Sequence, residues 1–179
     1  MIAIDAISVG AEAIDDIKTY LRVGIREEDA LIARLAATAI GHGERFIRQM
    51  MLVRPVRETL RAGAAWTRLS AMPVTAIAGV EAVPATGDPV ALAVDAHAID
   101  IDAAGTGWLR LTTPGAGMRV RVRYDAGIAP DWAGLPDPLR QGVVRLASHL
   151  YTHRDSADEG APPSAVVALW RPWRRMVLA

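Results

Sequence analysis

Two histidines in the last third of the chain have a spacing that could bind a metal ion. His149 and His153 are four residues apart in a segment with helical periodicity, so both imidazoles could lie on one helix face, and Asp155 could add an oxygen ligand. Neither an H-E-x-x-H glutamate nor a clear third ligand is present, and histidines near a helix C-terminus also interact favourably with the helix dipole. We therefore predict no metal and no cofactor, and keep a small metal-dependent enzyme as an alternative.

A third histidine lies in a carboxylate-rich stretch that superficially resembles a catalytic site. His97 is surrounded by Asp95, Asp100 and Asp102, which we interpret as alternating polar positions on the open face of a short strand or hairpin. The chain has no cysteine, no G-x-S-x-G elbow, no G-x-x-x-x-G-K-[ST] loop and no G-x-G-x-x-G after a strand. We predict that the protein is not an enzyme.

Three arginines alternate with apolar residues in the segment "GMRVRVRYDAG". Arg119, Arg121 and Arg123 would project side by side from one face of a strand, about 7 Å apart, which is near the spacing of neighbouring DNA phosphates. The other interpretation is a solvated face that pairs with acids on an adjacent strand, and we favour it. The DNA-facing interpretation stays as an alternative function, a nucleic-acid-binding module.

The C-terminal "LWRPWRR" gathers residue types that dominate protein–protein binding hot spots, tryptophan and arginine. Residues 154–163 are polar and rich in Asp, Gly and Pro, so they read as a linker that gives the segment reach. The segment either anchors another protein or folds its tryptophans back on the protein's own core. In the first case we expect another chain to order it. The candidate anchor residues are Leu169, Trp170, Arg171, Trp173, Arg174 and Arg175.

Helical periodicity at both ends of the chain encloses a β-rich middle. Apolar residues recur at helical spacing in residues 11–21, in a second segment that ends near residue 47, and in residues 136–153. Between them, short strands are expected at 73–83, 89–95, 98–102, 107–113 and 118–124. Gly41 and Gly43 in the second helix predict the close approach of another backbone.

These elements predict an α+β fold with a mainly helical core, made by the two N-terminal helices and the helix near 136–153. A small β-sheet or barrel would be inserted into this core, and a short helix would follow the linker. The expected domains are a core at 1–153 with its insertion at about 53–128, a linker at 154–163 and a docking segment at 164–179.

Composition narrows the partners and the setting. Twenty basic residues balance twenty acidic ones among 179, which argues against a protein coated in positive charge for binding nucleic acid. No apolar run approaches the roughly 20 residues that cross a bilayer, and "MIAIDAISVG" has no basic n-region, so we expect no membrane and no signal peptide. We expect a protein that is made and kept in the cytoplasm.

Five stretches of the sequence follow one another in an order that is known from one protein family. They are "IDDIKTYLRVG", then the acid-led helix "REEDALIARLAATAIGHGERFI", then a β-rich insertion that ends in "VRVRYDAG", then "LRQGVVRLASHLY", and finally "PPSAVVALWRPWRR". This order resembles the head-tail connector, or adaptor, proteins of tailed bacteriophages and gene transfer agents.

The resemblance implies a structural part of a virion or phage-like particle, made in the bacterial cytoplasm and located at the head-tail junction. Such adaptors form rings, commonly of twelve copies, beneath the portal protein, and they join it to a stopper or tail-terminator protein. The genome passes through the ring without sequence-specific contacts. Carried over to this chain, the resemblance implies that the six anchor residues bind the portal.

Overall fold

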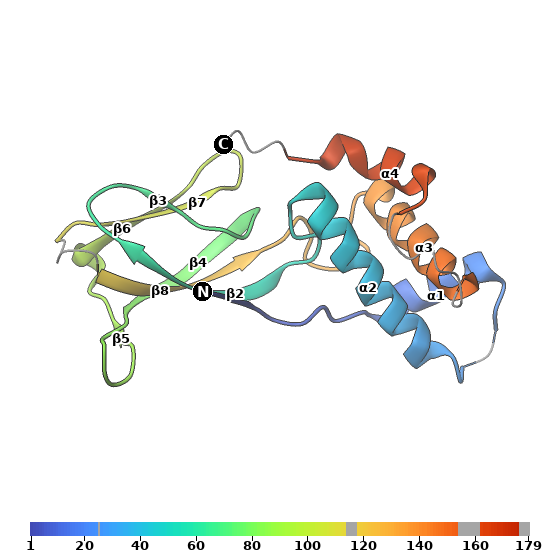
Figure 1. Ribbon diagram of the computed structural model, residues 1–179, viewed down its shortest axis with the longest axis horizontal. Coiled ribbons are helices and arrows are strands. Elements are labelled where there is room, and N and C mark those ends of the chain that lie inside the picture. The colour runs from blue at the N-terminus through green and yellow to red at the C-terminus, as the bar shows by residue number, and fades with distance from the viewer. Residues whose placement is uncertain (25, 114–117, 154–161, 176–179) are drawn as a thin grey trace. The chain divides into compact units, whose positions relative to one another are not determined.

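The computed structural model describes residues 1–24, 26–113, 118–153 and 162–175, and the chain divides into two compact units. The sheet unit comprises Met1–Ala6 and Val53–Ile128. The helical unit comprises Ile7–Leu52 and Ala129–Ala179. Figure 1 labels the elements of both units, which are described separately below.

The helical unit is built around one central helix. Its helices are α1 (Ala11–Leu21), α2 (Asp29–Ile47), α3 (Asp137–Thr152) and α4 (Ser164–Trp170), and the 3₁₀ turn η2 (Arg171–Trp173) follows α4. Helix α3 contacts α1, α2 and α4 (Figure 1). The helices predicted at 11–21, up to residue 47, and at 136–153 are all present. Within the described residues, no helix has the length and apolar character needed to cross a membrane.

Regular apolar spacing explains why α2 forms and which way it faces. The residues at helical spacing in α2 are the ones that the unit buries, while Arg34 and Thr38 on the opposite face are exposed. The helix therefore buries one continuous stripe against its neighbours. The buried positions are Ile32, Ala36, Ala39, Ile40, Gly43 and Ile47.

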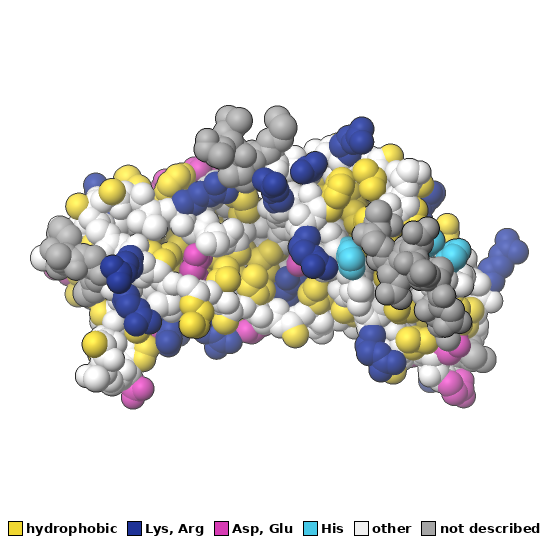
Figure 2. Space-filling model, in the orientation of Figure 1, with side chains coloured by type: hydrophobic (Ala, Val, Ile, Leu, Met, Phe, Trp, Pro, Cys, Tyr) yellow, Lys and Arg dark blue, Asp and Glu magenta, His cyan; other side chains and the backbone are white. Residues whose placement is uncertain are grey.

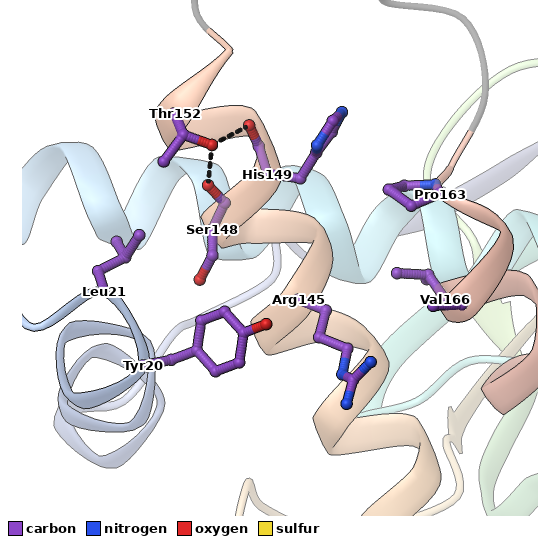
Figure 3. Close-up of a pocket in the computed structure, with 9 residues that line it drawn as sticks. Tyr20, Leu21, Arg145, Ser148, His149, Thr152, Pro163 and Val166 are labelled. Carbon is purple, nitrogen blue, oxygen red and sulfur yellow. Dashed lines mark hydrogen bonds between the residues drawn. The ribbon is translucent and has the colours of Figure 1, made fainter.

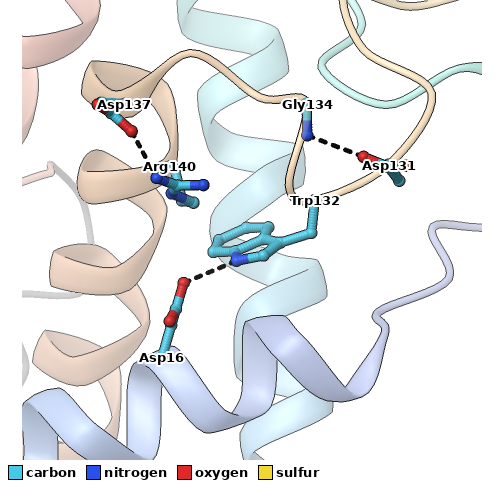
Figure 4. Close-up of polar contacts among 6 residues, drawn as sticks. All are labelled: Asp16, Asp131, Trp132, Gly134, Asp137 and Arg140. Atoms are coloured by element: carbon cyan, nitrogen blue, oxygen red, sulfur yellow. Dashed lines mark hydrogen bonds and ion pairs between the residues drawn. The ribbon is translucent and has the colours of Figure 1, made fainter.

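Polar contacts tie α1 to the rest of the helical unit. The Lys18 ammonium lies 2.6 Å from a carboxylate oxygen of Asp29, the first residue of α2. The indole N–H of buried Trp132 donates to Asp16 at 2.8 Å, which links α1 to the loop before α3 (Figure 4). These contacts add polar links to the packing of α1, whose buried residues are Ala13 and Ile17.

Two aspartates stabilise the loop before α3 and the first turn of this helix. The Asp131 carboxylate accepts a hydrogen bond from the Gly134 N–H at 2.8 Å, and Asp137 pairs with Arg140 in the first turn of α3 (Figure 4). An acid in this first turn also suits the positive end of the helix dipole. The loop and the helix start are therefore specified locally.

The sheet unit contains two antiparallel sheets. The larger sheet has the strand order β1-β2-β8-β4-β5, and the smaller has the order β3-β7-β6. The sheets pack together, since β7 contacts β2 and β6 contacts β4. The strands of the large sheet are β1 (Ile2–Ile4), β2 (Arg54–Ala62), β4 (Val74–Ala82), β5 (Val90–Ala91) and β8 (Met118–Ala126). Those of the small sheet are β3 (Thr67–Arg68), β6 (His97–Ile101) and β7 (Gly107–Leu111), and the 3₁₀ turn η1 (Val94–Ala96) precedes β6.

The prediction of a mainly helical core with a small inserted sheet or barrel is wrong. The described residues contain eight strands in two sheets, and β2, β4 and β8 are nine residues long each. No individual strand was expected at the positions of β1, β2 and β3, although β2 and β3 lie within the expected β-rich insertion. In β2, a charged residue, Glu58, takes a buried position where the alternating pattern calls for an apolar one.

Glu58 is buried because three donors satisfy its carboxylate. It accepts hydrogen bonds from the Ser70 N–H at 2.9 Å, from the Ser70 hydroxyl and from the Tyr124 hydroxyl at 2.7 Å. The Tyr124 oxygen in turn accepts from the Ala71 N–H at 3.1 Å. Burial, and then the hydrogen bond to Glu58, raise the pKa of the Tyr124 phenol far above its usual range. The network joins β2, β8 and the segment before β4.

We expect Tyr124→Phe to lower the free energy of unfolding by about 1–3 kcal/mol, because it removes one partner from each of two buried polar groups. Urea unfolding monitored by circular dichroism measures the change. Tyr20→Phe is the matched control, since Tyr20 is 53% exposed and should change stability by less than about 0.5 kcal/mol. Equal stability of the two variants would contradict the role of the network.

Candidate functional site

The first candidate site is the C-terminal segment, which the structure places against the helical unit of the same chain. Trp170, at the end of α4, has 0% of its surface exposed. Its indole N–H donates to the Leu139 carbonyl of α3 at 3.3 Å, and its ring lies 6.2 Å from the Phe46 ring of α2, measured between centroids. Trp170 is therefore a core residue of this unit.

Two glycines form the seat for the Trp170 ring. A Cβ built on Gly142 of α3 would lie 2.6 and 2.8 Å from Trp170 Cε2 and Cδ1. A Cβ on Gly43 of α2 would lie 3.1 and 3.2 Å from Trp170 Cζ2 and Cη2, and it would also collide with the Met51 methyl. The expectation that another backbone approaches Gly43 is therefore wrong, because the approaching groups are side chains. Gly41 has nothing within 4 Å, and no contact explains it.

Further contacts hold the residues after Trp170 against α2 and its C-terminal end. The Gln49 side chain donates to the Trp173 carbonyl at 2.7 Å, and the Arg175 N–H donates to the Ile47 carbonyl at 3.0 Å. The Arg174 guanidinium lies over the Phe46 ring, 5.7 Å from its centroid. The expectation that only another chain orders this segment is wrong for residues 164–175, because they pack on their own helical unit.

The six predicted anchor residues thus differ in accessibility. Trp170 is buried, whereas Arg171 and Arg174 are exposed. The other three, Leu169, Trp173 and Arg175, are half-buried. The exposed side chains of the segment are thus two arginines near the half-buried Trp173 in sequence, and the buried Trp170 attaches the segment to α2 and α3.

The second candidate site is the outward face of the large sheet, where β8 carries the predicted arginine ladder. Arg119 and Arg123 are exposed and Arg121 is half-buried, and Figure 2 shows several dark blue side chains over the end at which β8 begins. Glu81 of β4 lies 3.2 Å from Arg123 Nε and 3.9 Å from Arg121 Nη1. The favoured interpretation, pairing with acids on an adjacent strand, therefore applies to Arg121 and Arg123.

Sequence reading missed that β2 extends this arginine face. In the β2–β8 register, Arg61 lies opposite Arg119 and Arg57 lies opposite Arg123. Arg57 pairs with Asp5 at 2.8 Å, but Arg61 and Arg119 have no acid partner within the part of the chain that the structure describes. Like charges directly opposite each other destabilise a sheet. If β2 is recognised as a strand, the alternate positions Arg57, Thr59 and Arg61 predict a polar face that continues the arginine face of β8.

The histidine pair does not form a metal site with other described residues. The rings of His149 and His153 stack with their centroids 4.2 Å apart, and His153 Nδ1 lies 3.0 Å from the His149 carbonyl oxygen. No group of three or more His, Asp or Glu side chains in the described residues could hold a metal ion. Asp155, the suggested third ligand, lies outside the described residues.

Among the carboxylates near His97, that of Asp102 holds the turn between β6 and β7. Asp102 accepts hydrogen bonds from the N–H groups of Ala104 and Thr106, both at 2.9 Å, and from the Trp108 indole at 3.1 Å. The pKa of the Asp102 carboxyl is lowered most by the hydrogen bond from the Thr106 N–H, and next by the hydrogen bond from the Trp108 indole. His97 Nδ1 lies 3.0 Å from the Ala93 carbonyl. These contacts favour the interpretation of the stretch as a structural hairpin.

Comparison with solved structures finds chains that are similar over essentially the whole length. One belongs to the neck of an empty GTA particle computed with C6 symmetry, with a TM-score of 0.81 and 25% identity, covering 100% of this chain and 97% of that chain. Another belongs to the virion of a native gene transfer agent (GTA) particle, with a TM-score of 0.77, 24% identity and coverage of 100% and 97%. A third belongs to the neck of a native GTA particle computed with C12 symmetry, with a TM-score of 0.73, 23% identity and coverage of 99% and 97%.

Comparison of the sequence with family models and with curated proteins gives no match. The chain therefore shares its fold with chains of gene transfer agent particles.

We expect Gly142→Ala to lower the free energy of unfolding by about 1–3 kcal/mol, because the added methyl overlaps the Trp170 indole. Gly41→Ala is the matched control within a helix. It meets no atom and should raise stability by up to about 1 kcal/mol through helix propensity alone. Urea unfolding measures both changes. Loss of stability in both variants, or in neither, would argue against a glycine seat for Trp170.

Proposed function

We propose that this protein is a structural head-tail connector, or adaptor, in the neck of a phage-like particle. One observation carries the proposal: the whole chain matches a chain from the neck of a GTA particle with a TM-score of 0.81 at 25% identity. The order of sequence stretches that resembles the adaptor family supports it independently, since that resemblance rests on residues and not on the fold.

In this proposal, copies of the chain form a ring beneath the portal and link it to a stopper or tail-terminator protein. The similar neck chains come from structures computed with C6 and C12 symmetry, which supports an assembly of repeated copies. Twelve copies is the number that the family resemblance favours. The role is assembly and involves no catalysis, and the site of action is the head-tail junction of a virion or gene transfer agent particle.

We assign portal docking to the surface of the C-terminal segment, with residues 154–163 as its linker. The exposed Arg171 and Arg174 and the half-buried Trp173 offer cationic and aromatic groups of the kind that dominate binding hot spots. Trp170 has a supporting role, because its buried ring holds this surface on α2 and α3. Leu169 and Arg175, which are both half-buried, complete the set of residues assigned to docking.

Genome passage through the ring is the remaining part of the proposal. A lumen that bound phosphates tightly would slow the passage of DNA, and the formal charge of zero on the chain favours a weak attraction. No sequence-specific contact is needed for this role.

We expect Trp173→Ala to weaken binding to the portal protein at least about tenfold, a loss of about 1.4 kcal/mol, while the helical unit stays folded. Biolayer interferometry on immobilised portal measures the affinity, and mass photometry of the mixture measures ring formation.

Trp66→Ala is the control for this experiment, because Trp66 is a 44% exposed tryptophan of the sheet unit and not of the docking segment. It should bind like the unaltered chain. If Trp173→Ala and Trp66→Ala both bind the portal with unaltered affinity, the assignment of docking to the C-terminal segment fails.

A second function, contact with DNA through the arginine face, is favoured by one specific observation. The cross-strand neighbours Arg61 and Arg119, which lack an acid partner among the described residues, place two positive charges side by side at a cost in stability. A phosphate between them would remove that cost. This function is compatible with a ring around DNA, or with an independent nucleic-acid-binding module.

Arg119→Glu should have opposite effects on binding and on stability. It should weaken binding to duplex DNA and flatten its salt dependence, while the new carboxylate pairs with Arg61 and raises the free energy of unfolding by about 0.2–1 kcal/mol. Fluorescence anisotropy at several salt concentrations and urea unfolding test the two effects. Arg34→Glu, on the exposed face of α2, carries the same charge change as a control. An equal loss of DNA binding in both variants would attribute binding to overall charge.

A further inference from the structure

A pocket of ≈ 290 Å³ opens on the helical unit at the junction of α1, α3 and the start of α4 (Figure 3). The pocket has an apolar part and a polar part. Leu21, Pro163, Ala165 and Val166 supply apolar surface. The polar side chains are Tyr20, Arg145, Ser148, His149 and Thr152.

Ser148 carries the strongest sign that the pocket binds something. The side chain is 4% exposed, and its hydroxyl oxygen is buried without a hydrogen-bond partner among the described residues. Figure 3 shows this hydroxyl pointing toward the Tyr20 side chain, on the pocket side of α3. A buried hydroxyl without a partner costs stability, so native proteins usually satisfy it. A ligand in the pocket would supply the missing partner.

The charge of the lining indicates what kind of ligand this is. Arg145 lies one helical turn before Ser148, and no acid pairs with it within the described ranges. The Tyr20 and Ser148 hydroxyls can both donate to an oxygen. The Thr152 hydroxyl donates to the carbonyls of Ser148 and His149, so its proton is not available to a ligand. A guanidinium with two hydroxyl donors beside it suits a carboxylate.

We propose that this pocket binds a carboxylate on a short apolar stem, either as a free small acid or as an acidic side chain of a second copy of this chain. Arg145 pairs with the carboxylate, Ser148 donates the buried hydrogen bond, and Val166 and Leu21 contact the stem. The site belongs to the helical unit and does not depend on the proposed connector function.

NMR titration of the full chain with acetate, butyrate and butylammonium tests the proposal. Butyrate should shift the backbone amides around Arg145 and Ser148, and it should bind about fifteenfold more tightly than acetate, because two more methylenes are buried. Butylammonium, which has the same stem and the opposite charge, should not shift these amides. Equal binding of butyrate and butylammonium, or no shifts with butyrate, would overturn the proposal.

Two variants separate a ligand role from a structural one. Arg145→Gln and Ser148→Ala should each lower butyrate affinity at least about fivefold, the loss expected of a removed hydrogen bond or charge, whereas Arg34→Gln on α2 should leave it unchanged. Ser148→Ala should not destabilise the free protein, because the hydroxyl has no partner to lose among the described residues. Unchanged butyrate affinity in both pocket variants, or a clear loss of stability in Ser148→Ala, would overturn the proposal.

Sedimentation velocity then distinguishes the two sources of the carboxylate. If the acid comes from a second copy of the chain, saturating butyrate and Arg145→Gln should both reduce self-association. Self-association that is unchanged by both treatments would assign the pocket to a free small acid.

Discussion

The indole of Trp170 fits between α2 and α3 because each helix has a glycine where the ring lies. Gly43 of α2 and Gly142 of α3 leave room for the ring, Leu139 accepts its N–H and Phe46 lies beside it. Burying a tryptophan removes more apolar surface from water than any other residue does, and its loss typically costs about 3–5 kcal/mol. One side chain thereby joins α4 to the bundle and sets the position of everything that follows it in the segment.

This constraint separates two roles within a short stretch. Trp170 is committed to the core, which leaves Arg171, Trp173 and Arg174 on a surface whose backbone is held by Gln49 and Ile47. A preorganised surface loses less conformational entropy on binding than a free tail does. The docking surface that we propose would therefore be preorganised before any partner binds.

In the sheet unit, the two faces of β2 and β8 differ in how well their polar groups are paired. On the inner face, Glu58 and Tyr124 form a network in which each described polar group has a partner. On the outer face, arginines lie opposite arginines, with Glu81 shared between two of them. The inner face therefore stabilises the sheet through hydrogen bonds, whereas the outer face places like charges opposite each other at a cost in stability.

Local patterns in the sequence were sufficient for α1, α2, α3 and β8, because a helix or strand with one buried face repeats its apolar residues at 3.6 or 2 positions. The same patterns predicted a short helix that begins at Ser164, which α4 confirms. They failed for β2, where Glu58 breaks the alternation and is satisfied only by Ser70 and Tyr124, which lie in other segments of the chain.

Whether a residue is core or surface was decided by tertiary contacts alone. Trp170 and Trp173 look equivalent in the sequence, yet only Trp170 finds two glycines on separate helices to receive it. The partner of Arg123 and the lack of one for Arg119 among the described residues depend on strand register, and the Ser148 pocket depends on how α1, α3 and α4 meet. Periodicity acts between near neighbours along the chain, whereas pairing and cavities arise between segments that only the folded structure brings together.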